Sequence, residues 1–410
     1  MKHLILLLIA MSFSLFGSCG TTPRNPQPDD NRVSVDSLQD NLIAAGNDFA
    51  FRFLKQIDSK EEKDWFVSPV SLQFLLGLVL DGAEGETAAE IARTLGYGDE
   101  EAEAVDLYCR RMLDTLPKLD KQIRLKLANA IFFNKTMHIE KDYRHRIEKF
   151  YDAQVESLDF NQKKSSLNTI NGWCSKQTEG MIPGVLDDVD PGMFAYLLNA
   201  LYFKGQWSYP FNERWTEDRP FHREDGSETK VKMMEKERKY SYEETDLYQR
   251  IRLPYGEGPF SMVVLLPKKG HTVSEVIASI DGAKWDALRK SWDFPKVNLW
   301  LPRFETKYHI KLNDILCEMG MPRSFAKGAE FKPMSPDALW LDFVQQDAVI
   351  KVDEKGSEAA AVTSAGMLGA TAVPNPPKII DFHCDHPFLY LITEAHTGAI
   401  LFAGKYTGKE

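Results

Sequence analysis

The sequence lacks the compositional features of several protein classes. Its five cysteines in 410 residues are too few for a disulfide-dense scaffold. Its 50 lysines and arginines face 60 acidic residues, and the net charge of −10 leaves no surplus of cations for phosphates. This balance argues against a general nucleic-acid or acidic-membrane binder. With 43% hydrophobic and 27% charged residues, the chain is predicted to be globular.

Common catalytic and metal-binding motifs are also missing. There is no Gly-x-Ser-x-Gly elbow, no Gly-x4-Gly-Lys phosphate loop and no His-Glu-x-x-His helix. The densest cluster of potential ligands is residues 383–386, where neighbours on a strand would point to opposite faces. We therefore predict no catalytic residue, no metal site and no cofactor. The basic run from Lys118 to Lys126 is expected to be a solvated face, although polyanion binding there stays open.

The first residues are predicted to be a signal for export. Residues 1–18 carry Lys2 and a short apolar run, too short to span a membrane, and are predicted to be a signal peptide. Small residues precede Cys19, a pattern that resembles the bacterial lipobox, in which the cysteine is acylated. We expect Cys19 to anchor the protein to the bilayer of a bacterial cell envelope; the alternative is plain cleavage and secretion. Residues 19–36 are polar and proline-containing, which predicts a tether.

Residues 37–410 show no break in composition and are predicted to form one α+β domain. Helical spacing of apolar residues predicts an opening helix from Leu38 to Ile57. Ser68-Pro69 should begin a second helix, which is apolar on all sides and therefore buried. Thr87 and Glu90 fit a capping box for a third helix that ends at Gly96.

Short apolar runs predict the strands, which dominate the second half. They are Leu127–Phe133, Leu197–Phe203, Ser261–Leu266, Val349–Val352, Phe388–Ile392 and Ala399–Ala403. The first two share the pattern Leu-x-Asn-Ala-x-x-Phe, which we attribute to common strand packing. Four scattered cysteines remain within the domain, and the sequence leaves their pairing open. They are Cys109, Cys174, Cys317 and Cys384.

Residues 353–373 form an unusual segment of small side chains. From Ser357 to Val373 only Glu358 is charged, and prolines follow. A loop of this length in a compact domain is usually functional. Read as a strand, its alternate residues from Ser357 onward are small or adaptable, so that one face could be buried. The same sequence could therefore exist as an exposed loop and as a central strand, as in a strain-driven switch.

Several motifs in order resemble one family, the serpins, over essentially all of the domain. The matching pieces are Phe66–Ser71, Asn199–Trp207, Leu253–Tyr255, Leu301–Phe304, Leu316–Met321, Glu354–Ala361 and Asp385–Phe388. The resemblance implies three sheets, eight to nine helices and an exposed reactive loop. It also implies a monomeric, irreversible suicide inhibitor of serine proteases, not an enzyme. The protease cleaves the loop, becomes acylated, and is trapped as the loop inserts into the main sheet.

The resemblance assigns roles to particular residues. The hinge is Glu354, Gly356, Ser357, Glu358, Ala359, Ala360, Ala361 and Val362. Sixteen residues after Glu354, the reactive bond falls at Ala370–Thr371, although any bond from Leu368 to Val373 stays open. No lysine or arginine lies between Lys355 and Lys378, which disfavours trypsin-like targets and favours elastase-like ones. Subtilisin-like enzymes are the alternative target.

A polar cluster under the opening sheet and a tryptophan below the loop complete the expected site. They are Ser68, Ser71, Asn199, Gln346 and Trp207. Family members commonly have histidine where this chain has Gln346. The rival function is a non-inhibitory serpin that acts as a binding or chaperone-like module. The absence of proline from Ser357 to Val362 favours inhibition.

Overall fold

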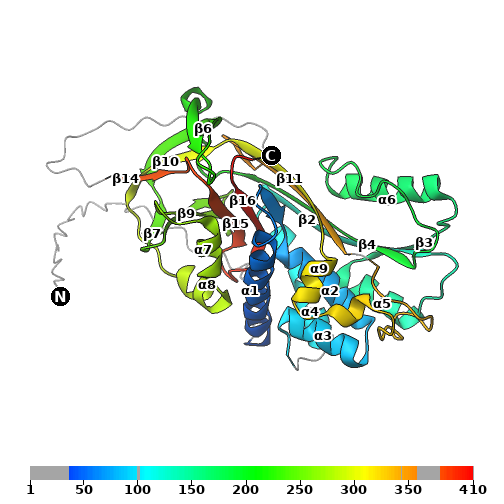
Figure 1. The fold of residues 1–410 in the computed structure, drawn as a ribbon. Coiled ribbons are helices and arrows are strands. Elements are labelled where there is room, and N and C mark those ends of the chain that lie inside the picture. The colour runs from blue at the N-terminus through cyan, green and yellow to red at the C-terminus, as the bar shows by residue number, and fades with distance from the viewer. Residues whose placement is uncertain (1–36, 99–101, 343, 358–378, 410) are drawn as a thin grey trace, which may run out of the picture. The chain divides into compact units, whose positions relative to one another are not determined.

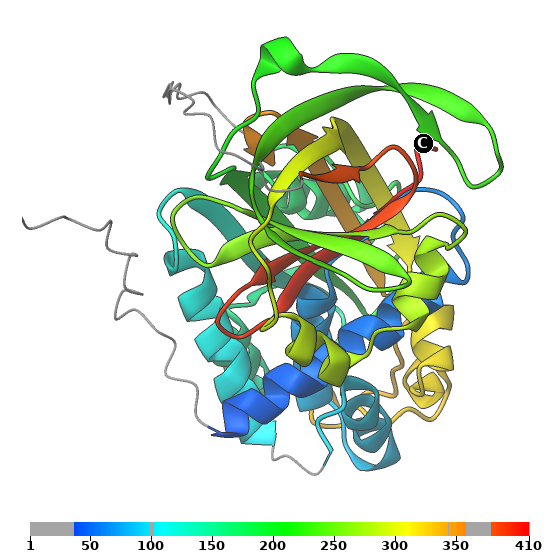
Figure 2. The ribbon, with the colours of Figure 1, turned by 90° about the vertical axis from the view of Figure 1, so that its left-hand side faces the viewer.

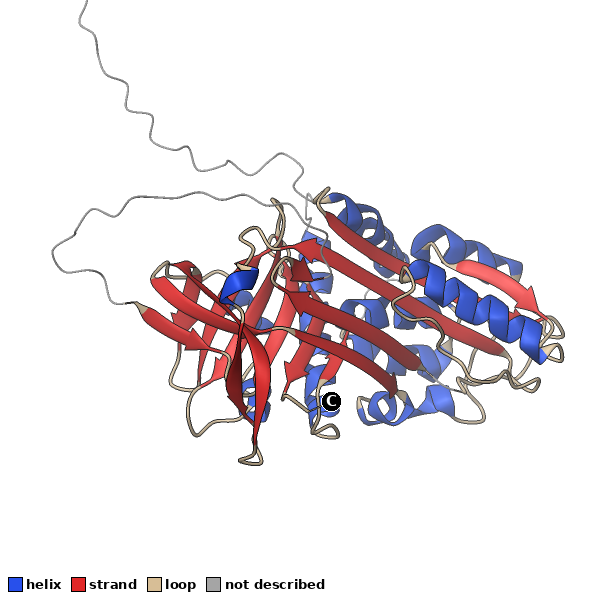
Figure 3. Cartoon of the chain, turned by 90° about the horizontal axis from the view of Figure 1, so that it is seen from above, coloured by secondary structure: helices blue, strands red, loops and turns tan. Residues whose placement is uncertain are grey.

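The domain combines nine α-helices with three sheets among the residues that the structure describes. The structure is a computed structural model that describes residues 37–98, 102–342, 344–357 and 379–409. Figure 1 shows the element order, and Figure 3 separates helices from strands by colour. The α+β class, the three sheets and the helix number predicted from the sequence are confirmed.

The helices follow the predicted pattern at the start of the domain. They are α1 Ser37–Asp58, α2 Pro69–Asp81, α3 Gly85–Leu95, α4 Ala102–Thr115, α5 Lys141–Tyr151, α6 Lys163–Gln177, α7 Val273–Ala278, α8 Gly282–Leu288 and α9 Asn313–Glu318. The amphipathic first helix is confirmed. Helix α2 is buried along most of its length and is capped by the Ser68 side chain, as predicted.

For α3, the predicted N-terminal cap is wrong and the predicted C-terminal end is confirmed. The helix already begins at Gly85, so Thr87 lies inside its first turn. The Thr87 hydroxyl instead accepts a hydrogen bond from the backbone N–H of Glu330 at 2.9 Å. A contact from a distant segment thus replaces the local cap. Gly96 ends the helix in the left-handed conformation, with φ +77°, as expected.

Two sheets lie on the left-hand side of the domain in Figure 1. The first has the order β1-β16-β15-β9-β8-β7 and comprises β1 Trp65–Val67, β7 Ser241–Glu244, β8 Tyr248–Pro254, β9 Phe260–Pro267, β15 Phe388–Glu394 and β16 Ile400–Tyr406. The second has the order β14-β10-β6-β5 and comprises β5 Glu217–His222, β6 Glu228–Lys239, β10 Lys296–Pro302 and β14 Ile380–His383. The apolar runs predicted for β9, β15 and β16 are confirmed as strands.

The last strand of the chain lies inside the first sheet. Strand β16 pairs with β1 on one side and β15 on the other, and Figure 2 shows β15 and β16 (red) in the middle of the domain. Lys405 of β16 reaches Asp58 at the end of α1, with 2.6 Å between Nζ and Oδ1. Both side chains are about 95% buried, so the pair fixes the end of the chain to its first helix.

The third and largest sheet carries the candidate site. Its order is β11-β12-β13-β4-β2-β3, and it comprises β2 Ile123–Asn134, β3 Gln154–Leu158, β4 Ala195–Gln206, β11 Phe304–Lys311, β12 Gln345–Asp353 and β13 Gly356–Ser357. Because side chains alternate along a strand, β2 and β4 supply two separate cores. One packs against α6, and the other packs against α2 and the remaining helices.

Candidate functional site

The hinge begins as a short strand inside the largest sheet. Strand β13 pairs antiparallel with β12 and also with β4, so β12 and β4 run parallel to each other. Ser357 lies opposite Val352 on one side and Gly205 on the other. Among the described residues, β13 is the only segment hydrogen-bonded into the ladder between these two strands. The sheet therefore already contains Gly356 and Ser357, two residues of the predicted hinge.

Glycine is required where this segment enters the sheet. Gly356 has φ +154°, a conformation that side chains rarely tolerate. A Cβ placed on Gly356 would lie 2.1 Å from the carbonyl oxygen of Gly205 and 2.7 Å from Cα of Gln206. No real contact is that short, so any other residue here would push the hinge away from β4.

Ser357 points into the interior. Its side chain is buried, with 1% exposed, and its hydroxyl hydrogen-bonds to the Tyr255 hydroxyl at 2.6 Å. Burial raises the pKa of Tyr255, so its hydroxyl stays protonated. The ring of Tyr255 stacks on Trp207 with 4.4 Å between centroids. The Ser357 side chain of the hinge thus contacts Tyr255, which in turn stacks on Trp207.

Trp207 holds the turn that precedes β13. Its indole Nε1 donates to the carbonyl oxygen of Asp353 at 2.9 Å, and its backbone N–H donates to Lys355 O at 2.8 Å. The backbone N–H of Phe211 donates to Glu354 O at 2.8 Å. Three consecutive carbonyl groups of the turn are therefore held by one short stretch after β4, which lies under the hinge.

Glu354 is a buried carboxylate with two partners. It is 3% exposed, accepts a hydrogen bond from the Thr216 hydroxyl at 2.6 Å, and forms an ion pair with Arg303. Burial acts to raise the pKa of Glu354, but the hydrogen bonds from Arg303 and Thr216 outweigh it and lower the pKa below its ordinary value. The hinge carboxylate is therefore charged at neutral pH and tied to the segment just before β11.

The predicted polar cluster divides into two groups. In the first group, the side-chain amide of Gln346 forms two hydrogen bonds with the backbone of Ser68. Its Oε1 accepts from Ser68 N at 2.8 Å, and its Nε2 donates to Ser68 O at 3.0 Å. The Ser68 hydroxyl donates to Leu401 O at 2.6 Å and caps α2 by accepting from Ser71 N. Gln346 thereby connects β12 to the start of the buried helix.

The second group connects β4 to β2 and α5. Nδ2 of Asn199 donates to Oδ1 of Asn129 at 2.8 Å, and Nδ2 of Asn129 donates to Tyr151 O at 3.0 Å. Within the described chain, Asn199 Oδ1 and the Ser71 hydroxyl are buried without a hydrogen-bond partner. No side-chain hydrogen bond of the described residues joins the two groups, so the cluster does not fasten β4 to β12.

Some expected site residues lie outside the described part of the chain. These are Cys19, the hinge residues Glu358, Ala359, Ala360, Ala361 and Val362, and the bond Ala370–Thr371. The four cysteines of the domain, Cys109, Cys174, Cys317 and Cys384, are free thiols in the structure. In the ranges that the structure covers, no cluster of potential metal ligands occurs, and none of the helices is long and apolar enough to cross a bilayer.

Sequence reasoning missed four contributors to this site. Tyr255 and Arg303 lie in motifs that resemble the family, and Thr216 has no such signal. The roles of all three were missed, because their partners lie 51 to 138 residues away. Asn129 did have a signal. The shared Leu-x-Asn-Ala pattern places Asn129 and Asn199 directly opposite each other in the β2–β4 register, which we had attributed to strand packing alone.

The geometry defines a class: α+β proteins whose main sheet takes up a neighbouring segment between two parallel strands. Comparison with known proteins gives the family. The family model described as Serpin (serine protease inhibitor) matches residues 44–408. The chain belongs to the serpin family, a family of protease inhibitors.

Individual relatives agree with this assignment. Serpin B6 of Macaca fascicularis is 33% identical over 381 residues, which cover 90% of this chain and 99% of that protein. The native structure of a thermophilic serpin, tengpin, matches with a TM-score of 0.82 at 28% identity, over 91% of this chain and 95% of tengpin. Human thyroxine-binding globulin matches with a TM-score of 0.81 at 26% identity, over 90% of this chain and 98% of that one.

Proposed function

We propose that this serpin is an irreversible suicide inhibitor of serine proteases, with elastase-like enzymes as its preferred targets. The observation that carries the proposal is β13: the hinge already occupies a position between two parallel strands. A longer insertion would give each added residue ladder hydrogen bonds on both sides, and the small residues after Ser357 can be buried there.

The proposed chemistry takes place at Ala370–Thr371. The serine of the protease attacks the Ala370 carbonyl carbon, an ester forms, and the amine of Thr371 leaves. The released hinge side then inserts between β12 and β4 before water hydrolyses the ester. The residues from Leu368 to Val373 are uncharged, which suits a shallow apolar specificity pocket.

The test is to mix the full chain with an elastase-like protease and run a denaturing gel. A complex that survives boiling in detergent supports the proposal, and N-terminal sequencing of the released fragment should begin at Thr371. Cleavage without a complex would contradict it. Insertion also predicts that the cleaved protein melts well above the intact one, and equal melting temperatures would exclude insertion.

The alternative is a non-inhibitory serpin that acts as a binding or chaperone-like module. The likeness to human thyroxine-binding globulin favours it, because that protein is seen in complex with thyroxine, a small molecule. For the whole protein, we further propose anchoring to a bacterial envelope through acylated Cys19. The lipobox-like residues before Cys19 support this proposal.

A further inference from the structure

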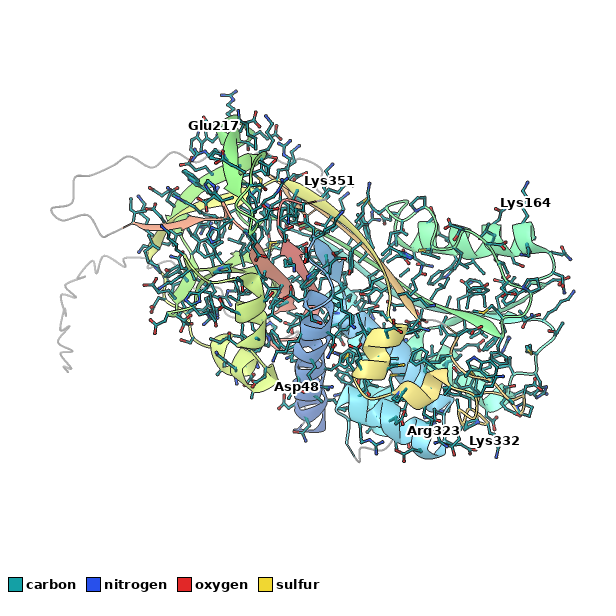
Figure 4. The ribbon with its side chains drawn as sticks, in the orientation of Figure 1. Asp48, Lys164, Glu217, Arg323, Lys332 and Lys351 are labelled. Atoms are coloured by element: carbon teal, nitrogen blue, oxygen red, sulfur yellow. The ribbon has the colours of Figure 1, made fainter. Side chains whose placement is uncertain are left out.

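A cavity of about 590 Å³ lies where strands of all three sheets meet. It is bounded by β6, by β11 and β12 at the edge of the largest sheet, and by the end of β16. Figure 4 labels one of its lining residues, Lys351, at the upper end of the largest sheet in that view. The cavity is separate from the position of β13.

The lining is strongly cationic. It contains five basic side chains and two carboxylates, namely Arg223, Lys230, Lys232, Arg303 and Lys351 with Asp64 and Glu305. Lys230 and Lys232 share a face of β6 because they are two residues apart. Lys351 of β12 lies opposite Glu305 in the register with β11. Cations from different sheets thus face one space.

The two carboxylates are already engaged elsewhere. Asp64 accepts hydrogen bonds from the backbone N–H of Thr407 at 2.6 Å and from its hydroxyl at 2.7 Å, and burial raises the pKa of Asp64. Glu305 forms an ion pair with Lys307, with 2.9 Å between Oε1 and Nζ. Neither acid is therefore fully available to neutralise the lysines of the cavity.

Three of the cations keep donors free. Lys232 is paired with Asp218 at 2.9 Å, but the side chains of Lys230 and Lys351 form no ion pair or hydrogen bond with another described residue. Arg223 holds a main-chain carbonyl oxygen through Nε at 2.9 Å, and its terminal nitrogens form no hydrogen bond with any described residue. Three positive side chains that surround one cavity match a ligand with several negative charges.

Arg303 joins the cavity to the hinge. Its Nη2 pairs with the buried carboxylate of Glu354, while 44% of its side chain remains exposed and it also lines the cavity. A guanidinium has five N–H donors, so Arg303 can meet a ligand with the donors that Glu354 leaves unused. A ligand anion and Glu354 would then share one cation and repel each other.

We propose that this cavity binds a small polyvalent anion with phosphate or carboxylate groups, and that the ligand competes with Glu354 for Arg303. Binding and the hinge are coupled reciprocally, because each anion weakens the hold of Arg303 on the other. A ligand bound in the cavity therefore weakens the ion pair between Arg303 and Glu354. The effect on protease inhibition rests on the proposed function, whereas the binding itself does not.

The experiment measures melting of the full chain in pyrophosphate or citrate, at an ionic strength kept constant with sodium chloride. We expect a saturable rise in melting temperature. The double variant Lys230→Gln/Lys351→Gln should weaken binding about tenfold or more, since two ligand contacts are lost. Lys164→Gln on α6, an exposed lysine that Figure 4 labels far from Lys351, removes one charge elsewhere and should bind as the wild type.

The Glu354→Gln variant tests the coupling. Removal of the competing carboxylate should tighten anion binding about fivefold, within the usual range of coupling between sites. A response to pyrophosphate alone identifies a phosphate ligand, and a response to citrate alone identifies a carboxylate ligand; either supports the site. An equal response in the double variant, or binding only of a long sulfated polysaccharide, would overturn the proposal. The melting experiment contains no protease. A failure of the protein to inhibit a protease would therefore not affect the conclusion about anion binding.

Discussion

Gly356 lies so close to the carbonyl oxygen of Gly205 that position 356 has no room for a side chain. A Cβ on Gly356 would meet the carbonyl oxygen of Gly205 at 2.1 Å, and a Cβ on Gly205 would meet Phe203 and Tyr255 at 3.0 Å. The entry of the hinge into the sheet therefore depends on two glycines in neighbouring strands: Gly356 of β13, which pairs with Gln206, and Gly205 of β4, which pairs with Ser357. The cost of breaking this contact can be measured.

The Gly356→Ala variant should lose the pairing of β13. We expect the free energy of unfolding to fall by about 1–3 kcal/mol, because the methyl group clashes with backbone. Amide hydrogens in residues 345–357 should exchange faster. Gly328→Ala is the matched control, since Gly328 also has positive φ, +96°, but nothing lies within 4 Å of its Cβ position. Equal effects of both variants would mean that backbone strain, and not the contact with Gly205, is responsible.

The Ser357→Arg variant should turn the inhibitor into a substrate. Ser357 is 1% exposed and contacts Tyr255, so an arginine would carry an unpaired charge into the packed layer at a cost of several kcal/mol. Denaturing gels should show cleavage without a stable complex, whereas Ser357→Ala should still form the complex. Undiminished complex formation by the arginine variant would refute the inward role of Ser357 during insertion.

The Gln346→Leu variant should destabilise the domain by about 1–3 kcal/mol, because it leaves the buried N–H of Ser68 without a partner and removes one of the two hydrogen bonds to the Ser68 carbonyl oxygen. Urea unfolding measures this loss. Gln177→Leu is a suitable control, since its side chain forms no hydrogen bond with any described residue and should change stability little. If both variants unfold at the same urea concentration, Gln346 does not anchor β12 to α2.

An acidic pair beneath the largest sheet predicts a pH dependence. Asp81 and Asp106 share Arg146, and Asp106 also accepts the Tyr151 hydroxyl at 2.9 Å. Burial, followed by the nearby charge of Asp81, raises the pKa of Asp106 to about 7. Because this value exceeds that of the unfolded chain, about 3.9, the carboxyl stabilises the fold at low pH and loses that contribution as the pH rises through 7.

The Asp106→Asn variant should remove this dependence. Between pH 5 and pH 8 we expect the wild type to lose about 1–3 kcal/mol more unfolding free energy than the variant. Asp114→Asn is the control: it also removes one negative charge from α4, but at a more exposed site, where Asp114 is paired with Arg110 at 2.8 Å. This variant should keep the pH dependence of stability of the wild type. Parallel stability profiles for wild type and Asp106→Asn would show that Asp106 does not titrate in this range.

The Cys19→Ala variant should move the protein from the membrane fraction to the soluble fraction. An acyl chain contributes about 0.8 kcal/mol for each buried CH₂ group, and its loss removes the proposed anchor. Cys317→Ala, at a half-buried cysteine of the domain, is the control and should remain with the membrane. A Cys19→Ala protein that stays with membranes would contradict the lipobox interpretation.

The sequence was informative where structure is set by local spacing. The periodic apolar residues of α1, the Ser68 cap of α2 and the stop at Gly96 were all predicted, because each depends on residues within one or two turns. The capping box predicted at Thr87 was wrong because the Thr87 hydroxyl forms a hydrogen bond with a residue 243 positions away. The same reason explains why the partner of Glu354 was not found.

The polar cluster shows a finer limit of sequence reasoning. Residue types suggested which side chains belong to the cluster, but the number and direction of their donors decide the connections. Gln346 has one donor group and one acceptor, and Ser68 takes both. Asn199 consequently turns to Asn129 instead. Such a choice depends on three-dimensional distances that residue types alone do not contain.

The buried pair of Lys405 and Asp58 has a consequence for biosynthesis. The two residues are 347 positions apart. Strand β16 lies between β1 and β15, so the first sheet is incomplete until β16 is in place. The opening helix therefore cannot complete its packing while the chain is still emerging from the ribosome. Only after β16 has been synthesised can Lys405 reach Asp58 and the first sheet gain the strand that joins β1 to β15.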